Sequence, residues 1–469
     1  MNIVLQVWLG FEALLLGLFG AVEQGQSFTE IETMVGEKLS SIGRMCLAWA
    51  LEKVDEQLRE NAADRRGWVV VRREDRKKIL TTLGEVEYNR TYYRNKKTGE
   101  YAYLADDVMG LTSHQRVSVG LKAHLVEHAA DVSYRKSGEW AEGLTKAGVL
   151  SASTVMNSIR AFEPDVIEEE VPRQKRRCEV LFVEADEDHV AGQGGGNHNV
   201  PLVYVHEGKE KVNKGRFKLK GVRYFSGVYE EAEELWLSVW DYIEEQYDTS
   251  CLKRVFICGD GAQWVKKGLE VIPNSVFVLD LFHLDRYITA AFGRDSKHYS
   301  QLWELIWGGS IGDIESWFKR LDLRWASESQ RQAVRVCWRY ISQNWYGITA
   351  YRLYSEAQLG VSAEAHVSHV LSARLSSRPM AWSKKGADQM ARLRAMQANG
   401  KSIRQAYIKQ CAVKVQRLKA SPPSVSKERE QLRRVVGEVT FDNLPALRGP
   451  VTQLSRALKA ISRAVVGVL

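Results

Sequence analysis

Two short apolar runs place the strongest constraint on the fold of this chain, because an aspartate follows each of them. Leu181-Phe182-Val183 comes shortly before Asp186, and the run over 255–259 comes immediately before Asp260. Short apolar runs bounded by polar residues and glycine are typical of buried β-strands. The pattern therefore predicts two buried strands with a carboxylate at the end of each.

The order of the elements around these runs predicts the fold class. We expect strands over 178–183, 200–205 and 217–228, a helix over 229–246, a strand over 255–258, a short helix from Gln263, a strand over 275–279 and a further helix. This β-β-β-α-β-α-β-α order is that of the ribonuclease-H-like fold, an α/β core with a mixed five-stranded sheet. Its first and fourth strands are neighbours, so Asp186 and Asp260 would converge.

Changes of pattern divide the 469 residues into six regions. They are an N-terminal helix and β-hairpin region over 1–110, a helical, helix-turn-helix-like region over 111–173, the first part of the core over 174–284, an all-helical insertion over 285–355, a core helix over 356–400 and a basic tail over 401–469. Six of the fourteen tryptophans lie in the insertion. We expect them to form its core; the alternative is that one or two stack on unpaired bases.

The first hundred residues predict two helices and then strands. Ile3 to Val22 is apolar, but no basic residue precedes it and Glu12 interrupts it, so we expect a packed amphipathic helix rather than a signal or membrane anchor. Apolar residues at steps of three and four predict a long helix over 28–60. Runs rich in Val, Tyr and Thr over 68–71 and 83–104, with a turn at 97–100, predict a β-hairpin region.

A helix-turn-helix pattern follows over 134–162. A first helix would run from Tyr134 to Leu144, Gly148 would make the turn, and Ser151 would cap a second helix with Val155, Ile159 and Phe162 facing inward. The alternative is a helical hairpin that binds no DNA. The residues expected to reach base edges or phosphates are Arg135, Lys136, Thr154, Asn157 and Arg160.

The charge and the cysteines limit the partners and the compartment. Residues 401–469 hold 14 Lys and Arg against 4 Asp and Glu, or +10, so that the rest of the chain sums to −2. Such a basic segment commonly lies along phosphates, although a solvated helical face is an equal alternative. Six cysteines without a Cys-x-x-Cys pair exclude a zinc ribbon and a disulfide framework, which indicates free thiols in a reducing cytoplasm. We expect no membrane partner.

Paired carboxylates at one sheet edge suit a particular chemistry. Oxygen ligands of this kind favour Mg²⁺ or Mn²⁺. Two such ions about 4 Å apart can activate the attacking oxygen and stabilise the leaving oxygen in phosphodiester attack, which makes a general-base side chain unnecessary. The alternative is that the acids only cap the following helices, as Asp260 before Gly261 could.

Four segments together point to a family. They are Glu184-Ala185-Asp186-Glu187-Asp188-His189-Val190, Gly259-Asp260-Gly261-Ala262-Gln263-Trp264, Leu279-Asp280-Leu281-Phe282-His283-Leu284, and Glu364-Ala365-His366-Val367-Ser368-His369-Val370-Leu371 with its continuation through Arg374 to Pro379. The chain resembles, over nearly its whole length, the ISLre-type insertion-sequence transposases, which are relatives of the Mutator-like branch of the DDE superfamily. One departure is Ala365, where the family pattern would have glycine.

The resemblance implies a set of functional residues. Asp186, Asp260 and Glu364 would be the catalytic acids and would hold two Mg²⁺ or Mn²⁺ ions, with the Asp280-x-x-His283 element close by. Val367, Val370 and Leu371 recur at helical spacing, so this helix would pack on the sheet while Glu364 and Arg374 project toward metal and phosphate. Arg374 and Arg378 would contact DNA. Glu356 and Asp388 are the rival third acids, and a helix-start role for Glu364 is the structural alternative.

The resemblance also implies a reaction and its partners. The protein would cleave double-stranded DNA at the terminal inverted repeats of its own insertion sequence and join the freed 3′ hydroxyl to target DNA. We expect a homodimer or higher oligomer on DNA, in the bacterial cytoplasm at the nucleoid. One alternative is a decayed or repurposed transposase that only binds DNA. Another is a metal-dependent nuclease without strand transfer.

Overall fold

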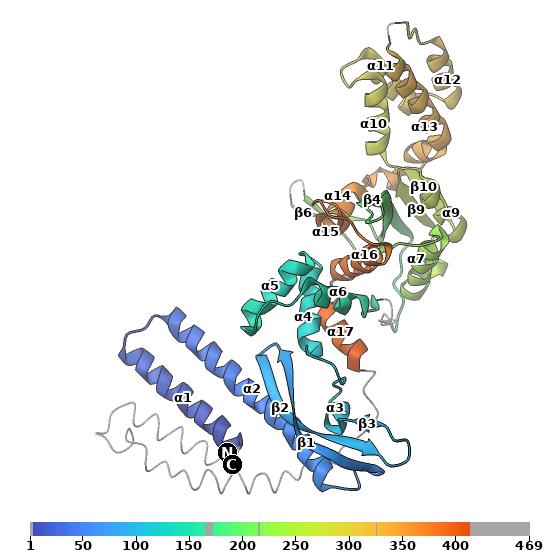
Figure 1. Ribbon diagram of the computed structural model, residues 1–469. Helices are drawn as coiled ribbons and strands as arrows, with labels where there is room; N and C mark the ends of the chain where they lie inside the picture. Colours follow the sequence, from blue (N-terminus) through green and yellow to red (C-terminus); the bar gives the residue numbers. More distant parts are fainter. Residues whose placement is uncertain (1–2, 165–171, 214–215, 325, 413–469) are drawn as a thin grey trace. The chain divides into compact units, whose positions relative to one another are not determined.

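The computed structural model describes residues 3–164, 172–213, 216–324 and 326–412 (Figure 1). The described chain forms two compact units. Unit 1 takes residues up to Leu125, Arg135–Val155 and the chain from Tyr407, whereas unit 2 takes Val126–Tyr134 and Met156–Ala406.

Unit 1 begins with two long helices, α1 (Ile3–Glu23) and α2 (Phe28–Glu60). Ser27 and Glu30 form a capping box at the start of α2: the Ser27 amide donates to Glu30 Oε2 at 2.7 Å, and Ser27 Oγ accepts from the Glu30 amide. The helix predicted over 28–60 is therefore confirmed.

The prediction that α1 is a packed helix is confirmed in part, because α1 packs along α2. Leu14 and Ala21 are buried, but Leu9, Phe11 and Leu16 are exposed among the described residues. The reason is that α1 is apolar nearly all round, so packing on one neighbour covers only a stripe of it. By length and composition α1 could cross a membrane, a test that signal sequences and core helices also pass.

A three-stranded antiparallel sheet completes this part of unit 1, in the order β1 (Trp68–Thr81), β2 (Gly84–Asn95), β3 (Tyr101–Ala102). The predicted turn before β3 is confirmed, with Gly99 at φ +76°. Asp106 of α3 (Leu104–Val108) is buried and accepts from Lys77 Nζ at 2.8 Å and from Tyr88 Oη at 2.6 Å. This buried carboxylate ties α3 to both long strands.

The predicted helix pair is confirmed at the level of secondary structure. After α4 (Val119–Ala129), α5 spans Tyr134–Thr145 and α6 spans Ala152–Arg160. Gly148 makes the turn at φ +78°, a backbone conformation that favours glycine. Ser151 Oγ accepts from the Thr154 amide at 3.2 Å, as an N-cap does. As predicted, Val155, Ile159 and Phe162 are buried.

Unit 2 is built on a mixed five-stranded sheet in the order β10-β9-β4-β5-β8. The strands are β4 (Val180–Ala191), β5 (Asn197–His206), β8 (Arg223–Ser226), β9 (Arg254–Gly259) and β10 (Ser275–Leu279). β4, β9 and β10 are parallel to one another, whereas β5 is antiparallel to β4 and to β8. The predicted pairing of the first and fourth strands, β4 and β9, is confirmed, and the fold is mixed α/β.

Two strand predictions need correction. β4 continues through Asp186 to Ala191, because its antiparallel pairing with β5 extends to Ala191 opposite Asn197, so Asp186 lies inside a strand rather than at its end. The strand predicted over 217–228 is two strands. β7 (Arg216–Leu219) pairs with β6 (Lys209–Asn213) in a separate hairpin, and Gly221 at φ +63° turns the chain before β8.

Alternate side chains of β4 face two different layers. Leu181, Val183 and Ala185 belong to a core shared with α7 (Ala232–Gln246). On the other face, Phe182 packs with residues of β9, β10 and the C-terminal part of α13 (Glu328–Leu353). Because side chains alternate along a strand, Glu184, Asp186 and Asp188 share this second face.

The described residues of the insertion predicted over 285–355 form helices joined by short loops. It contains α10 (Leu281–Phe292), α11 (Lys297–Gly308), α12 (Ile311–Arg320) and α13 (Glu328–Leu353). The prediction that tryptophans form its core is corrected: Leu302, Ile306 and Ile314 are fully buried, whereas Trp303, Trp317, Trp338 and Trp345 are partly buried around the core and Trp307 is exposed. Trp325 lies outside the described residues.

Short helices complete the described chain. After β9 come α8 (Gln263–Lys266) and α9 (Gly268–Val271). Glu364, the predicted third acid, lies on α14 (Ala363–Val367). This helix continues through one π-helical turn over Ser368–Ser372 into α15 (Ala373–Leu375). Then follow α16 (Lys384–Ala398) and α17 (Ile403–Ala412). Most of the predicted basic tail, from residue 413 on, lies outside the described residues.

Candidate metal-binding site

Strand register aligns three aspartates at one edge of the sheet in unit 2. The parallel ladder of β4 and β9 ends at Glu184 opposite Cys258, two positions before Asp186 and Asp260. The ladder of β9 and β10 ends at Leu279 opposite Gly259, one position before Asp280 and Asp260. Asp260 and Asp280 therefore directly follow the ends of β9 and β10, and Asp186 lies in the neighbouring strand β4.

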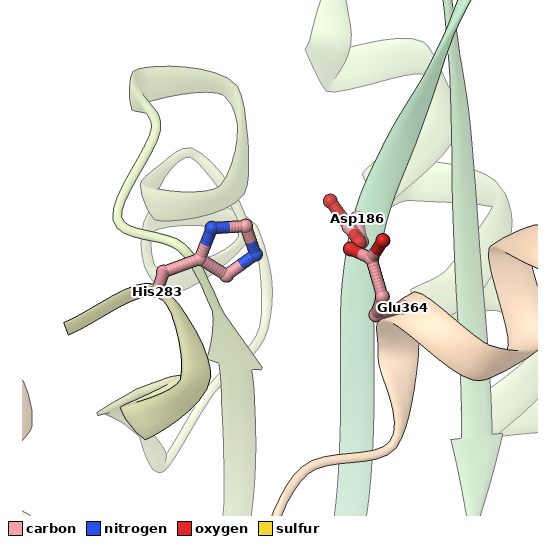
Figure 2. Close-up of side chains that lie close together, drawn as sticks. All are labelled: Asp186, His283 and Glu364. Atoms are coloured by element: carbon pink, nitrogen blue, oxygen red, sulfur yellow. The ribbon is translucent and has the colours of Figure 1, made fainter. Parts of the chain in front are cut away.

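Glu364 and His283 come to this edge from two helices. One ligand atom from each of Asp186, His283 and Glu364 lies within 4.8 Å of the others, and Figure 2 shows the carboxylates of Asp186 and Glu364 side by side with the imidazole opposite. Asp186 is inside β4, His283 is in the first turn of α10, and Glu364 is in the first turn of α14. The sequence predicted the meeting of Asp186 with Glu364. It did not predict that His283, rather than Asp260, completes the group within 4.8 Å.

Asp280 is connected to the site through His283. Its Oδ1 accepts from the Phe282 amide at 2.9 Å and caps α10, and its Oδ2 lies 3.9 Å from His283 Nε2. Asp280 is therefore the N-cap of α10, which places His283 in the first turn of that helix, facing the acids. The Asp-x-x-His spacing thus has a direct structural reason.

Asp260 is held by the loop that follows β9. Its Oδ1 accepts from the Ala262 amide at 2.8 Å, and its backbone carbonyl accepts from Tyr340 Oη at 2.6 Å. Gly261 adopts φ +88° against α13, where a Cβ would meet Asn344 Oδ1 at 2.3 Å. A side chain at position 261 would therefore displace the loop that sets the position of Asp260.

The electrostatics of the site favour a cation. The pKa of Asp186 is raised to about 6: burial is the largest cause, the Glu187 amide and His283 act to lower it, and the charges of Glu364 and Asp260 add to the rise. Burial also raises the pKa of Asp280, to which the charge of Glu364 contributes. Anions that repel one another in a partly buried place are stabilised by a divalent ion.

The donor set fits such an ion. Carboxylate oxygens are the usual ligands of Mg²⁺ and Mn²⁺, and an imidazole nitrogen is accepted more readily by Mn²⁺ and other transition ions than by Mg²⁺. Glu364 is exposed whereas Asp186 is only 9% exposed, so the group opens to solvent on the side of α14.

The helical segment that carries Glu364 packs as predicted, with one correction. Val367, Val370 and Leu371 are buried. Arg374 is buried as well, so the prediction that it projects beside Glu364 is wrong. Its Nε donates to the Ala129 carbonyl at 2.9 Å, its guanidinium lies 4.8 Å from the Trp382 ring centre, and burial lowers its pKa to about 10.

The physical reason for this difference is spacing: Arg374 comes three residues after Leu371 and four after Val370, so it shares their buried side of the segment. Arg378, beyond the end of α15, is exposed. Of the residues predicted to contact DNA in the helix pair, Arg135, Lys136, Asn157 and Arg160 are exposed, whereas Thr154 is half-buried and its hydroxyl lies 3.0 Å from that of Ser151.

Two further acids of β4 were not assigned a role from the sequence. Glu184 is 1% exposed and is hydrogen-bonded to Tyr204, His206 and Ser362, which hold its pKa below the ordinary value although burial acts to raise it. Asp188 accepts from Ser376 Oγ at 2.9 Å. The sequence does show acids at positions 184, 186 and 188, and this spacing of two puts them on one face of a strand.

Comparison with known proteins identifies the family. The model described as "Uncharacterised protein family (UPF0236)" matches residues 21–411. The chain belongs to the UPF0236 family. It is 36% identical over 472 residues to a UPF0236 protein of Caldanaerobacter subterraneus subsp. tengcongensis, with 99% of this chain and 98% of the relative covered. A second UPF0236 protein of that organism is 36% identical over 471 residues, with 99% and 98% covered.

Both alignments cover 99% of this UPF0236 member. Their printed names combine several locus designations each, eleven for the first and four for the second. Each name therefore stands for a protein encoded at several places in one genome.

Proposed function

We propose that this UPF0236 member is a metal-dependent DNA strand-cleaving and strand-joining enzyme, a DDE transposase with a ribonuclease-H-like core. The observation that carries the proposal is the convergence of Asp186 and Glu364 with His283, beside the loop that holds Asp260. Carboxylates from β4, from the end of β9 and from a later helix are the donor arrangement that two-metal phosphodiester chemistry requires.

Each residue of the site has a separate proposed role. Asp186, Asp260 and Glu364 would hold the ions, His283 would add a nitrogen ligand or contact the phosphate, and Asp280 would orient His283 through the 3.9 Å approach. Bound Mg²⁺ or Mn²⁺ ions would acidify the attacking water or 3′ hydroxyl and stabilise the leaving oxygen. The exposed side of Glu364 leaves room for the DNA backbone.

The repeated loci of the relatives support self-mobilisation. A gene that copies or moves itself is expected to occur several times in one genome, and eleven locus designations for one relative agree with that. Double-stranded DNA with the element's terminal repeats is then the substrate, in the bacterial cytoplasm, with a homodimer or larger oligomer to bring two ends together. The basic, exposed Arg135, Lys136, Arg160 and Arg378 are the proposed phosphate contacts.

Ala365 does not argue against activity. It is exposed within α14, so its methyl group meets solvent rather than a neighbour. Alanine also favours a helix more than the glycine of the family pattern does, by about 1 kcal/mol. We therefore propose an active enzyme rather than a decayed DNA-binding protein.

Cleavage and joining of labelled DNA test the proposal. With Mg²⁺ or Mn²⁺, the full-length protein should nick DNA that carries the terminal sequences flanking its gene and join the new 3′ end to a second duplex. Asp186→Asn, Asp260→Asn and Glu364→Gln should each lose several orders of magnitude in rate while binding DNA normally. Glu356→Gln, at an exposed acid that pairs with Arg254, is the matched control. Metal-independent cleavage, or full activity of any of the three variants, would refute the assignment; nicking without joined product would indicate a nuclease.

A further inference from the structure

A buried carboxylate lies beneath the segment that carries Glu364, and the metal-binding site itself does not use it. Glu184 is on β4, two residues before Asp186 and on the same face. It accepts from Tyr204 Oη at 2.6 Å, from His206 Nε2 at 3.0 Å and from the Ser362 amide, and Ser362 Oγ is 3.2 Å away. A buried charge is costly unless it is fully hydrogen-bonded, so these donors are constrained to their places.

Ser362 connects this carboxylate to the site. It precedes α14 directly, and Glu364 is the second residue of that helix. Ser362 does not cap the helix with its side chain; its hydroxyl turns instead toward Glu184 and Tyr204, whose Oη lies 3.1 Å from Ser362 Oγ. The start of α14 is thus anchored to the strand that carries Asp186.

A second contact holds α14 just beyond Glu364. The imidazole of His366 packs on the ring of Tyr204 with 4.5 Å between centroids, and its Nδ1 lies 2.8 Å from Tyr224 Oη. Tyr204 therefore contacts the segment both before and after Glu364. The exposed Glu364 side chain itself does not take part in this anchoring.

We propose that Glu184 and Tyr204 are positioning residues that hold the Glu364 carboxylate at metal-binding distance from Asp186. The inference rests on the proposed function, because it assigns these residues to the metal site. Glu364 comes from a short helix distant in sequence from β4, and a shift of that helix by 1 Å would separate the two carboxylates. Partners that orient metal ligands typically contribute about 10- to 100-fold in metal affinity.

The chain offers a matched control at the other end of the same helical segment. Ser376 Oγ donates to Asp188 at 2.9 Å, a serine–carboxylate bond to the same face of the same strand. Ser362→Ala and Ser376→Ala delete equivalent hydroxyl groups, but only the first lies next to Glu364. Tyr204→Phe removes the hydroxyl and keeps the ring against His366, and Ser362→Thr keeps a hydroxyl.

Mn²⁺ binding to the full-length protein, followed by electron paramagnetic resonance of the free ion, tests the inference alongside thermal unfolding in EDTA. We expect about tenfold weaker Mn²⁺ binding for Ser362→Ala and Tyr204→Phe, recovery in Ser362→Thr, and a change below about twofold for Ser376→Ala. Equal Mn²⁺ affinities of Ser362→Ala, Tyr204→Phe and Ser376→Ala, or losses that only follow their melting temperatures, would overturn the positioning role.

The same titration with Asp186→Asn distinguishes a failure of the metal site from a failure of the positioning role. If the wild-type protein binds Mn²⁺ and Asp186→Asn does not, the metal site stands, and the serine and tyrosine variants decide the positioning role alone. If Asp186→Asn binds Mn²⁺ as the wild type does, or neither binds, the metal site fails and the positioning role fails with it.

Discussion

Replacement of Asp186 by asparagine should stabilise the metal-free protein while it destroys the metal site. The pKa of Asp186 is about 6 in the folded chain, against an ordinary 3.8, with burial as the largest cause. The charged form is therefore disfavoured by folding. The difference corresponds to about 3 kcal/mol at neutral pH, as an order of magnitude.

The raised pKa of Asp186 determines how the stability of the protein changes with pH. Because the folded pKa is raised, the folded state holds its proton more tightly, and stability falls as pH rises from about 4 to about 6. Below about pH 4 the group is protonated in both states and costs nothing. Asparagine has no such charge, and its carbonyl can still accept from the Glu187 amide, which lies 2.8 Å from Asp186 Oδ1.

Thermal unfolding with and without metal measures both effects. In EDTA at pH 7 we expect Asp186→Asn to be more stable than the wild type by about 1–3 kcal/mol, with the difference vanishing near pH 4. With Mn²⁺ at a hundred times its Kd, the wild type alone should gain about 2.7 kcal/mol. Glu356→Gln should behave as the wild type throughout. A destabilised Asp186→Asn in EDTA, or equal stabilisation of both proteins by Mn²⁺, would refute the reasoning.

Three further predictions concern residues away from the acids. Arg374→Ala should lower the free energy of unfolding in urea by about 2–4 kcal/mol, through its lost hydrogen bond and ring packing, and should change DNA affinity less than Arg378→Ala does. Arg135→Ala with Lys136→Ala should weaken DNA binding in gel-shift assays at all sequences and make its salt dependence shallower by about two ions; an unchanged slope would contradict phosphate contact. Ala365→Gly should leave cleavage rates within about threefold and lower helix stability by about 1 kcal/mol, measured as a lower melting temperature.

Local pattern was enough to predict most of the elements. The period of apolar residues distinguishes the long helix α2 from the strands that follow it, and the order of elements in unit 2 predicts which strands pair. The predictions failed where pairing partners decide the outcome. β4 extends past Asp186 because β5 lies beside it, and no property of residues 186–191 alone indicates that.

The candidate site was predictable only in part. Asp186 and Glu364 were predicted to meet, and they do. The inclusion of His283 depends on the Asp280 cap, which sets the direction of α10 as it leaves β10. The spacing of Arg374 from Val370 and Leu371 places it on the buried side of its segment, but its partners, the Ala129 carbonyl and the Trp382 ring, come from segments that the local pattern does not identify.

The sequence by itself determined which chemical groups the chain has available. These are carboxylates after apolar runs, an Asp-x-x-His pair and a third acid on a helix. These depend on local spacing, which short-range sterics and hydrophobic periodicity translate into structure directly. Only the tertiary structure decided which of these groups lie within 4.8 Å of one another, and which buried acid of β4 anchors the segment that carries Glu364. Contacts between distant segments depend on packing and strand pairing across the whole unit, and no local stretch of the chain contains that information.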